Sequence, residues 1–294
     1  MARCIIFMPF GGDRAVVAYP GGPVMKTVSI IIALDYSGTL SAGAVAFGRA
    51  ERLLSALSHS GLADFGIDTP ERYWQGVVVP SWLTASVTRY PFARTIVDQV
   101  AALAPATAKP PADALNAAAD RFVAAYLSAS GISPPWQPVL RRLCRLNNAR
   151  VVVATDHYCD ATGAIIDHLA AMGLSAAAIE DSANRQCDVC VANSADLGCH
   201  KITPEYWQRV SSLSAPEAET VVLVDDFGGA ESDVAGYAAA SAVSHRRRRT
   251  REALGTVKDW AVHSYHFTPT GTAASLPGAV KDAEAYIRKV IHDV

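Results

Sequence analysis

The chain has 294 residues, of which 50% are hydrophobic and 18% charged, and its formal net charge is -2. This length accommodates one large domain or a core with a smaller insertion. The slight negative charge argues against a nucleic-acid partner, because phosphate backbones are bound through an excess of Lys and Arg. No segment approaches the roughly 20 consecutive apolar residues of a membrane span. The six irregularly spaced cysteines are typical of reduced thiols, so we expect a cytoplasmic protein with no membrane partner.

The first segment of the chain, residues 1–24, lacks the long apolar core and the small-residue cleavage site of a signal peptide. Met25 and Lys26 directly precede the first strand-like segment. We therefore predict that the fold begins there and that residues 1–24 are a disordered extension.

Three short apolar segments rich in β-branched residues are each followed by acids or hydroxyl side chains. Such segments predict strands that are buried on both faces of a parallel sheet. The carboxyl ends of parallel strands meet at one edge of a sheet, where open α/β sheets bind their ligands, so we expect the side chains after these strands to converge. The segments are 28–34, followed by Asp35, Ser37, Gly38 and Thr39; 149–154, followed by Thr155 and Asp156; and 220–224, followed by Asp225 and Asp226.

Residues 44–132, between the first two strands, have the pattern of a set of helices. An Ala- and Leu-rich segment over 45–60 predicts a helix that ends near Gly61. Thr69 is expected to cap the next helix, with Pro70 in its first turn, and residues 113–128 predict an amphipathic helix. Pro80 and the prolines after it are expected to break the segments between them.

The rest of the chain alternates between helix and strand patterns. This alternation predicts an α/β fold with a doubly wound, Rossmann-like parallel sheet. The core is expected to comprise residues 25–43 and 133–294, with the helices of residues 44–132 as an inserted cap. The predicted segments are helices over 138–146, 162–172, 204–210, 233–254 and 279–291, and strands over 188–192 and 260–267.

Four motifs in this chain resemble those of the haloacid dehalogenase (HAD) superfamily, and they occur in the family's order. The turn D-x-x-G-T-L begins at Asp35, the second strand ends at Thr155, and a later strand ends at the acid pair Asp225-Asp226. Before that pair, residues 193–207 read N-S-A-D-L-G-C-H-K-I-T-P-E-Y-W. This segment is similar to the family's polar turn, Leu-Gly and Lys-x-x-Pro-acid-aromatic-aromatic, and it aligns Lys201 with the family's lysine.

The resemblance implies a HAD-like hydrolase that uses Mg²⁺. Asp35 would attack phosphorus to give an aspartyl-phosphate, which divides one difficult displacement into two easier ones. Mg²⁺ would be held by Asp35, by the backbone carbonyl of Ser37 and by Asp225 or Asp226, because it prefers oxygen ligands. Which acid of the pair binds the metal stays open at this point.

The resemblance also implies which residues bind the substrate. Thr155 and Lys201 would bind the phosphoryl oxygens, beside Ser37, Gly38 and Thr39. In this family a helical cap closes over the site, which excludes water and completes the binding surface. The candidate cap contacts are Arg72, Trp74, Trp82, Arg89 and Tyr90, each with packing in the cap's own core or solvation as the alternative.

Ser37 departs from the pattern of the family's phosphatases, which carry a second Asp two residues after the nucleophile. General acid-base help of this kind is worth about 10²–10⁴ in rate, and a serine cannot supply it near neutral pH. Phosphonoacetaldehyde hydrolases carry Ala there and use a cap lysine. The only lysine in residues 44–132 is Lys109, which lies in a Pro-rich loop, so phosphonatase-like cleavage of a carbon–phosphorus bond is the weaker alternative. Asp156 is a candidate substitute for the missing acid, although capping the following helix is the simpler interpretation.

Two groups of metal-ligating residue types have simpler interpretations than a site. Cys187, Cys190, Cys199 and His200 have a spacing that resembles a zinc knuckle, but Cys190 falls inside a predicted strand, which disfavours a closed zinc site. His157 and Cys159 are interpreted as a surface imidazole and a packed thiol.

The basic run over residues 245–251 is interpreted as a solvated helix face. A subunit contact in a homodimer and the binding of an anionic substrate tail are the alternatives. Glu231 and Asp233 are both candidates for a further acid after the Asp225-Asp226 pair.

These patterns together predict a Mg²⁺-dependent hydrolase that releases phosphate from a small phosphorylated metabolite through Asp35. The alternative from another class is a HAD-like fold that has lost efficient catalysis at Ser37 and binds a phosphorylated ligand or a partner. Retention of the attacking carboxylate, the lysine and the metal acids favours the enzyme, because a binding domain needs no nucleophile.

Overall fold

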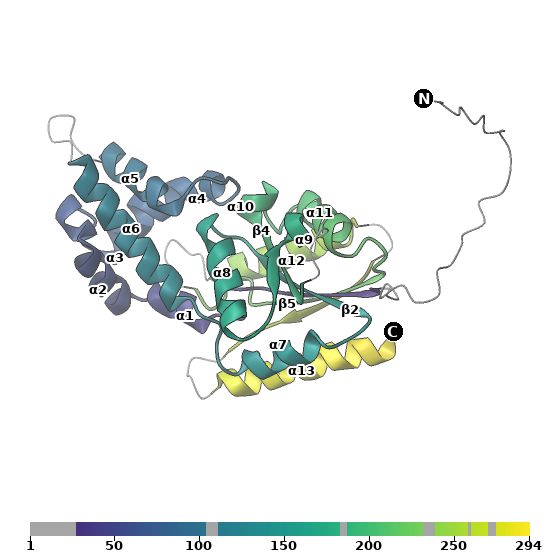
Figure 1. The fold of residues 1–294 in the computed structure, drawn as a ribbon. Helices are drawn as coiled ribbons and strands as arrows, with labels where there is room; N and C mark the ends of the chain where they lie inside the picture. Colours follow the sequence, from purple (N-terminus) through teal and green to yellow (C-terminus); the bar gives the residue numbers. More distant parts are fainter. Residues whose placement is uncertain (1–27, 104–110, 183–186, 232–238, 258–259, 270–274) are drawn as a thin grey trace, which may run out of the picture.

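A computed structural model of the chain describes residues 28–103, 111–182, 187–231, 239–257, 260–269 and 275–294. Its centre is a six-stranded, all-parallel sheet with the strand order β3-β4-β2-β1-β5-β6 (Figure 1). The predicted doubly wound α/β sheet is therefore confirmed. The strands are β1 (Ile30–Leu34), β2 (Ala149–Thr155), β3 (Ala176–Ala178), β4 (Val189–Asn193), β5 (Thr220–Asp225) and β6 (Ala261–His266).

The register of the central strands brings their carboxyl ends level with one another. Leu34 of β1 lies opposite Val153 of β2 and Val224 of β5. The backbone N–H of Asp35 still donates to the carbonyl oxygen of Val224 at 2.9 Å. The residues that follow these three strands therefore emerge side by side at one edge of the sheet.

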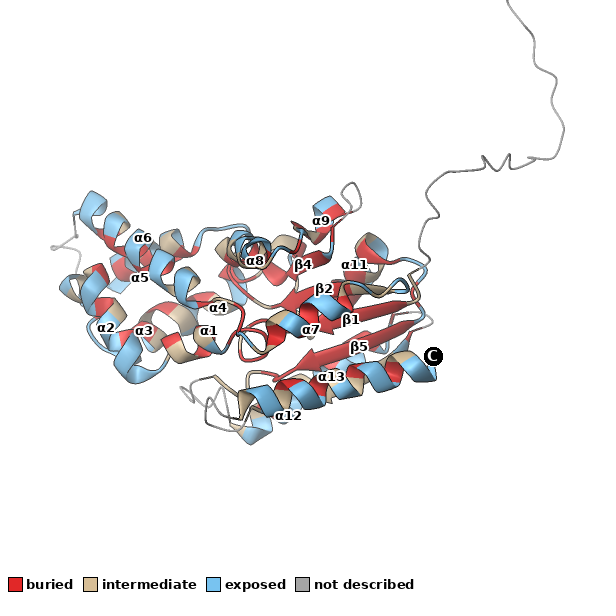
Figure 2. Ribbon diagram, turned by 60° about the horizontal axis from the view of Figure 1, so that its bottom comes forward, coloured by how far each residue is buried: buried red, intermediate tan, exposed pale blue. Residues whose placement is uncertain are grey.

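Alternate side chains of the buried strands pack on two layers of helices, one on each face of the sheet. Ile30, Ile32 and Leu34 pack with α7, α8 and α13, whereas Ile31 and Ala33 pack with the layer that includes α11 and α12. Figure 2 shows β1, β2, β4 and β5 as buried, and α13 with buried residues alternating with exposed ones along the helix. The helices of the core are α7 (Trp136–Leu143), α8 (Asp160–Ala171), α9 (Ile179–Ser182), α10 (Ser194–Leu197), α11 (Pro204–Ser214), α12 (Ala240–Leu254) and α13 (Leu276–Asp293).

Residues 42–129 form a group of helices with a hydrophobic core of their own, which we call the helical insertion. Leu57, Ile96 and Phe122 are fully buried within it. Tyr158, which follows β2, also packs into this core and joins it to the sheet. Figure 1 shows the insertion at one end of the molecule. Its helices are α1 (Ala42–Phe47), α2 (Ala50–Ser60), the 3₁₀ helix η1 (Leu62–Phe65), α3 (Pro70–Tyr73), the π-helix η2 (Trp74–Val78), α4 (Val79–Ala85), α5 (Phe92–Leu103) and α6 (Ala112–Ala129).

The structure differs from the sequence predictions at three places in these elements. Pro80 does not break a helix, because it lies in the first turn of α4 directly after the π-helical turn, whose wider register accommodates the missing N–H. The helix predicted over 45–60 is interrupted at Gly48, between α1 and α2. Strand β3 was not predicted, because Ala-Ala-Ala carries no strand signal.

Other predictions fall on residues outside the described ranges. They are the extension over residues 1–24, Lys109, Asp233 and the first part of the helix predicted over 233–254. Among the helices that the structure does describe, none is long and apolar enough to cross a membrane.

Candidate active site

The first part of the site is the tight turn after β1. The N–H of Leu40 donates to the carbonyl oxygen of Asp35 at 3.2 Å, which returns the chain toward the sheet. Gly38 has a φ of +78°, and a Cβ built on it would lie 2.3 Å from an Oδ of Asp226. Glycine is therefore needed both for the left-handed backbone and for the close approach of the two loops.

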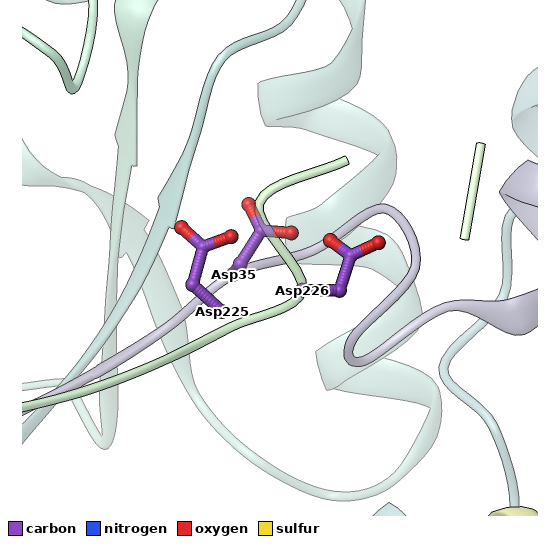
Figure 3. A group of neighbouring side chains, drawn as sticks. All are labelled: Asp35, Asp225 and Asp226. Atoms are coloured by element: carbon purple, nitrogen blue, oxygen red, sulfur yellow. The ribbon is translucent and has the colours of Figure 1, made fainter. Parts of the chain in front are cut away.

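Three carboxylates meet where β1 and β5 end. Oxygen atoms of Asp35, Asp225 and Asp226 all lie within 4.8 Å of one another (Figure 3). The three residues are 5%, 2% and 1% exposed. Ionised carboxylates this close repel each other and are costly to bury, so the cluster needs a cation.

Lys201 supplies one positive charge to this cluster. Its Nζ donates to Asp35 Oδ1 at 2.5 Å and to Asp225 Oδ2 at 2.8 Å. The backbone N–H of Lys201 donates to Asp156 Oδ1 at 2.9 Å, which fixes the lysine from the end of β2. The expectation that Asp156 caps the next helix is therefore wrong, because Cys159 is at the N-cap position of α8.

The loop after β5 is folded around its own two acids. Asp225 Oδ1 accepts the N–H of Phe227 at 2.6 Å, and the two oxygens of Asp226 accept the N–H groups of Gly228 and Ala230 at 3.2 and 2.8 Å. Phe227 has a φ of +53°, which is uncommon for a non-glycine residue. These bonds fix both carboxylates at the sheet edge.

Thr39 joins the two loops. Its buried Oγ1 accepts the N–H of Asp226 at 3.1 Å, and its carbonyl oxygen accepts Nε1 of Trp136 at 2.8 Å. Thr39 therefore orients Asp226, rather than facing the space where a substrate would lie.

The electrostatics of the cluster follow from burial and mutual repulsion. Burial raises the pKa of Asp35 well above its ordinary value, and Asp225 and Asp226 raise it further against the opposing effect of Lys201. Burial and the charge of Asp225 raise the pKa of Asp226 to about 7. Burial alone would lower the pKa of Lys201, but Asp225, Asp35 and Asp156 outweigh it and raise that pKa well above its ordinary value. One lysine therefore does not balance the three acids when all of them are ionised.

The donor set of this cluster fits Mg²⁺. Carboxylate oxygens are the hard ligands that Mg²⁺ prefers. A divalent cation would also neutralise the charge that Lys201 leaves uncompensated, since three buried acids face one ammonium group. Within the described part of the chain, no other group of His, Cys, Asp or Glu has metal-site geometry.

Ser37, at the position where the sequence lacks an acid, is paired with one in the structure. Its Oγ donates to Oε1 of Glu231 at 2.6 Å. Burial raises the pKa of Glu231, while Ser37 and Arg246 act in the opposite direction. Of the two candidate further acids, Glu231 therefore lies at the site, and Asp233 is outside the described residues.

A pocket of about 340 Å³ opens between the sheet edge and the helical insertion. The predicted site residues that line it are Asp35, Ser37, Trp74, Trp82, Thr155, Asp156, Lys201, Asp225 and Asp226. Gly38 and Thr39 lie behind this surface. The remaining part of the lining comes mainly from aromatic and aliphatic side chains of the helical insertion.

Three predicted cap contacts do not line this pocket. Arg72 is exposed and pairs with Asp68 at 2.9 Å, so its assignment to substrate binding is not supported by its position. Arg89 pairs with Glu180 of the core, and Tyr90 donates to Asp98 at 2.7 Å. These polar side chains stabilise the insertion and its contact with the core.

The interpretation of His157 as a surface imidazole is wrong. The ring is buried at the pocket, with Nε2 2.6 Å from the hydroxyl of Tyr126 and Nδ1 accepting the N–H of Tyr158 at 2.9 Å. Burial lowers the pKa of His157 to about 4. Because Nδ1 accepts a hydrogen bond, the neutral ring carries its proton on Nε2 and donates it to Tyr126.

The basic run over residues 245–251 contributes one arginine to the lining of the pocket. Arg246 lines the pocket, and its Nε donates to the carbonyl oxygen of Phe227 at 2.8 Å, so this residue is not part of a wholly solvated face.

The residues whose spacing resembles a zinc knuckle do not form a shared site. Cys187 Sγ lies 3.9 Å from Cys190 Sγ, whereas His200 Nε2 lies 2.8 Å from Ser86 Oγ.

No protein-family model matches the sequence, and no curated protein does. Among solved structures, the chain is similar to a 2-haloacid dehalogenase from Pseudomonas syringae pv. Tomato DC3000, at 17% identity over 69% of this chain and 82% of that one, with a TM-score of 0.43. It is similar to an L-2-haloacid dehalogenase from Xanthobacter autotrophicus, at 18% identity over 69% of this chain and 73% of that one, with a TM-score of 0.40.

A third similar structure is a HAD-family enzyme from Bacteroides thetaiotaomicron, at 12% identity over 85% of this chain and 98% of that one, with a TM-score of 0.46. At these values the likeness carries no argument about activity or substrate, which has to come from the site itself. The likeness to these haloacid dehalogenases and to this HAD-family enzyme is one of fold.

Proposed function

We propose that this protein is a Mg²⁺-dependent hydrolase that releases phosphate from a small phosphorylated metabolite, with Asp35 as the nucleophile. The observation that carries the proposal is the cluster at the sheet edge. There, three buried carboxylates share one lysine at the floor of a pocket. A domain that only binds a phosphate needs no carboxylate to attack the phosphorus atom.

The excess of negative charge favours attack on phosphorus in the presence of a metal. A phosphate monoester would be repelled by Asp35, Asp225 and Asp226 alone. These acids and the carbonyl of Ser37 would hold Mg²⁺, which supplies neutralisation of the phosphoryl oxygens when it is bound.

Asp35 attacks the phosphorus atom, the bond from phosphorus to the ester oxygen breaks, and an aspartyl-phosphate forms. Water then attacks the same phosphorus, so inorganic phosphate leaves and the Asp35 carboxylate is regenerated. Lys201 holds the Asp35 carboxylate in place through its bond to Oδ1. Lys201 and Thr155, which both line the pocket, would contact the phosphoryl oxygens.

The leaving group determines how much proton transfer is needed. Ser37 is not an acid, and its hydroxyl proton is committed to Glu231. Leaving groups that depart readily as anions need no proton, whereas an alkoxide takes one from water or from the substrate. We therefore expect the highest rates with acyl phosphates and aryl phosphates.

The second candidate function is binding of a phosphorylated ligand without efficient turnover. The observation that favours it is Ser37 itself, because loss of acid-base help is worth about 10²–10⁴ in rate. Lys201 and the metal acids would then serve binding alone.

The test is phosphate release from acetyl phosphate and p-nitrophenyl phosphate, with Mg²⁺ and with a chelator. We expect release with Mg²⁺, none with the chelator, and a loss of at least about 10⁴-fold in Asp35→Asn. Asp64→Asn, an exposed acid outside the pocket, is the matched control. Release of chloride from 2-chloropropionate would show that Asp35 attacks carbon instead of phosphorus. No release from any compound would favour the binding protein.

A further inference from the structure

The wall of the pocket that the helical insertion contributes carries no charged side chain. Among the described residues that line the pocket, twelve belong to residues 42–129, and none of them is Asp, Glu, Lys, Arg or His. Six are aromatic: Phe47, Tyr73, Trp74, Trp82, Phe92 and Tyr126. All the charged groups of the pocket lie on the opposite side, in the core.

This wall offers few hydrogen-bonding groups to a ligand. The hydroxyl of Tyr126 is engaged with His157 Nε2 at 2.6 Å. Nε1 of Trp74 is buried and has no hydrogen-bond partner among the described residues, so it is one donor that this wall leaves unused. A sugar or glycerol group placed there would lose its hydrogen bonds to water without full replacement, which costs free energy for every unpaired hydroxyl. A hydrocarbon group would instead gain from leaving water.

The rim of the pocket continues the same surface. Val79 and Leu83 lie one turn apart on α4, they are 49% and 77% exposed, and both line the pocket. Single exposed apolar residues are ordinary. Two on consecutive turns at the mouth of an aromatic pocket extend the apolar surface from its interior to solvent.

We propose that the substrate is a monophosphate whose organic part is an uncharged alkyl or aryl group. Its phosphate would lie at the Asp35 edge and its hydrocarbon part against the aromatic wall. This inference rests on the function proposed for the same site, and hydrolysis consumes one water and releases the alcohol and inorganic phosphate. The volume of about 340 Å³ lies at the low end of small-ligand pockets, so the group is small.

The first test is a series of n-alkyl monophosphates from methyl to hexyl, assayed with Mg²⁺. Their leaving alcohols have similar acidity, so intrinsic reactivity stays nearly constant along the series. Each methylene that enters the pocket is expected to raise kcat/KM about fourfold, until the pocket is filled. Butyl phosphate should exceed glycerol 3-phosphate and glucose 6-phosphate, and acetyl phosphate reports the chemistry without an apolar tail.

The second test is calorimetric binding of alkylphosphonates, which are not hydrolysed through a phosphorus–oxygen ester bond. Hexylphosphonate should bind more tightly than methylphosphonate, with a more negative heat-capacity change, the signature of apolar burial. Leu83→Gln should reduce the hexyl-to-methyl ratio, because it makes the rim polar. Leu54→Gln is the matched control, since Leu54 is 48% exposed but does not line the pocket.

The two tests separate this inference from the proposed function. Turnover of acetyl phosphate with a flat alkyl series, in rate and in binding, would overturn the apolar substrate and leave the hydrolase standing. Chain-length-dependent binding of phosphonates without turnover of any phosphate would support the apolar ligand and contradict the hydrolase.

Discussion

The two walls of the pocket are built in opposite ways. On the sheet side, the charged groups are held by hydrogen bonds: Lys201 Nζ donates to Asp35 and Asp225, and the backbone N–H of Lys201 donates to Asp156. On the insertion side, aromatic rings are held by packing, as in the stack of Phe92 on Tyr158 with ring centroids 3.9 Å apart. Charges placed beside a water-excluding apolar wall interact more strongly than in water.

The two walls separate the residues of the chemistry from those of substrate specificity. The acids are positioned by strand register, so they cannot move without disturbing the sheet. The aromatic wall comes from helices with a separate core, so its shape can vary while the sheet edge stays fixed. The following changes test that division, beginning with the largest expected effect.

Among these further changes, Lys201→Met should have the largest effect, because it removes the cation that pairs with Asp35 and Asp225. Breaking a buried ion pair leaves unpaired charge and costs about 3–5 kcal/mol of stability. Phosphate release from acetyl phosphate should fall by about 10³-fold or more, since both the nucleophile and the phosphoryl oxygens lose a partner. Urea unfolding in chelator and the release assay measure the two losses.

The matched control for this change is Lys281→Met, at an exposed position on α13. It should alter stability by no more than about 0.5 kcal/mol and leave the rate unchanged. A stable Lys201→Met protein in the absence of Mg²⁺ would show that the three carboxylates do not carry the charge that we assign to them.

The second change restores an acid at position 37. Ser37→Asp alone places a carboxylate where Ser37 Oγ lies 2.6 Å from Glu231, so repulsion should limit its benefit. Combined with Glu231→Gln, it should raise the hydrolysis of butyl phosphate by about 10²-fold, within the range of general acid-base help. The rate with acetyl phosphate, which needs no proton, should change little.

A double-mutant cycle provides the control for this prediction. The gain from Ser37→Asp should be larger in the Glu231→Gln background than in the original chain, because the two side chains are in contact. Equal gains in both backgrounds would contradict the pairing of these residues at the site.

The third prediction concerns pH and metal. The folded-state pKa of Asp226 is raised from 3.8 to about 7. The stability that its protonated form provides is present below pH 4 and is lost as the pH rises through 7. The loss is roughly 4 kcal/mol. We therefore expect metal-free protein to lose stability between pH 5 and pH 8 relative to Asp226→Asn, and Mg²⁺ to restore it at pH 8.

The comparison with Asp226→Asn is needed because another buried group titrates in the opposite sense. The lowered pKa of His157, about 4, means that its contribution to stability is lost as the pH falls below 6.5. Thermal unfolding with chelator and with Mg²⁺, at both pH values, measures the effect. At 100 times its dissociation constant, Mg²⁺ should stabilise the original chain by about 2.7 kcal/mol. Equal stabilisation of Asp226→Asn would contradict a role for this acid.

The charged wall on the sheet side of the pocket could be predicted from the sequence, because each buried strand is an apolar segment directly followed by acids or hydroxyl residues. Asp35, Thr155 and Asp225 each end or follow a short segment rich in β-branched residues, and parallel pairing then places them together. The strand β3 could not be predicted, because alanine has no strand preference and only pairing with β4 makes these residues extended.

The insertion wall could not be predicted in the same way. Phe47 and Phe92 have the spacing of core residues, and they are core residues that also line the pocket. The Ser37–Glu231 contact joins residues 194 positions apart across a glycine-rich loop whose length hides the pairing. A polar residue such as Arg72 is a candidate substrate contact from its type alone, although exposed arginines on helices are ordinary.

Arg72→Ala gives the smallest expected effect and tests the boundary of the insertion wall. Arg72 is exposed, pairs with Asp68 at 2.9 Å and donates to the carbonyl oxygen of Gly66 at 3.3 Å, and it does not line the pocket. An exposed pair of this kind is worth about 0.3–0.5 kcal/mol, so the melting temperature should fall by no more than about 2 °C. The kcat/KM for hexyl phosphate should change by less than about twofold. A tenfold loss of kcat/KM without a loss of stability would mean that the α3 region closes over the pocket when substrate binds, and that the wall includes a charged residue after all.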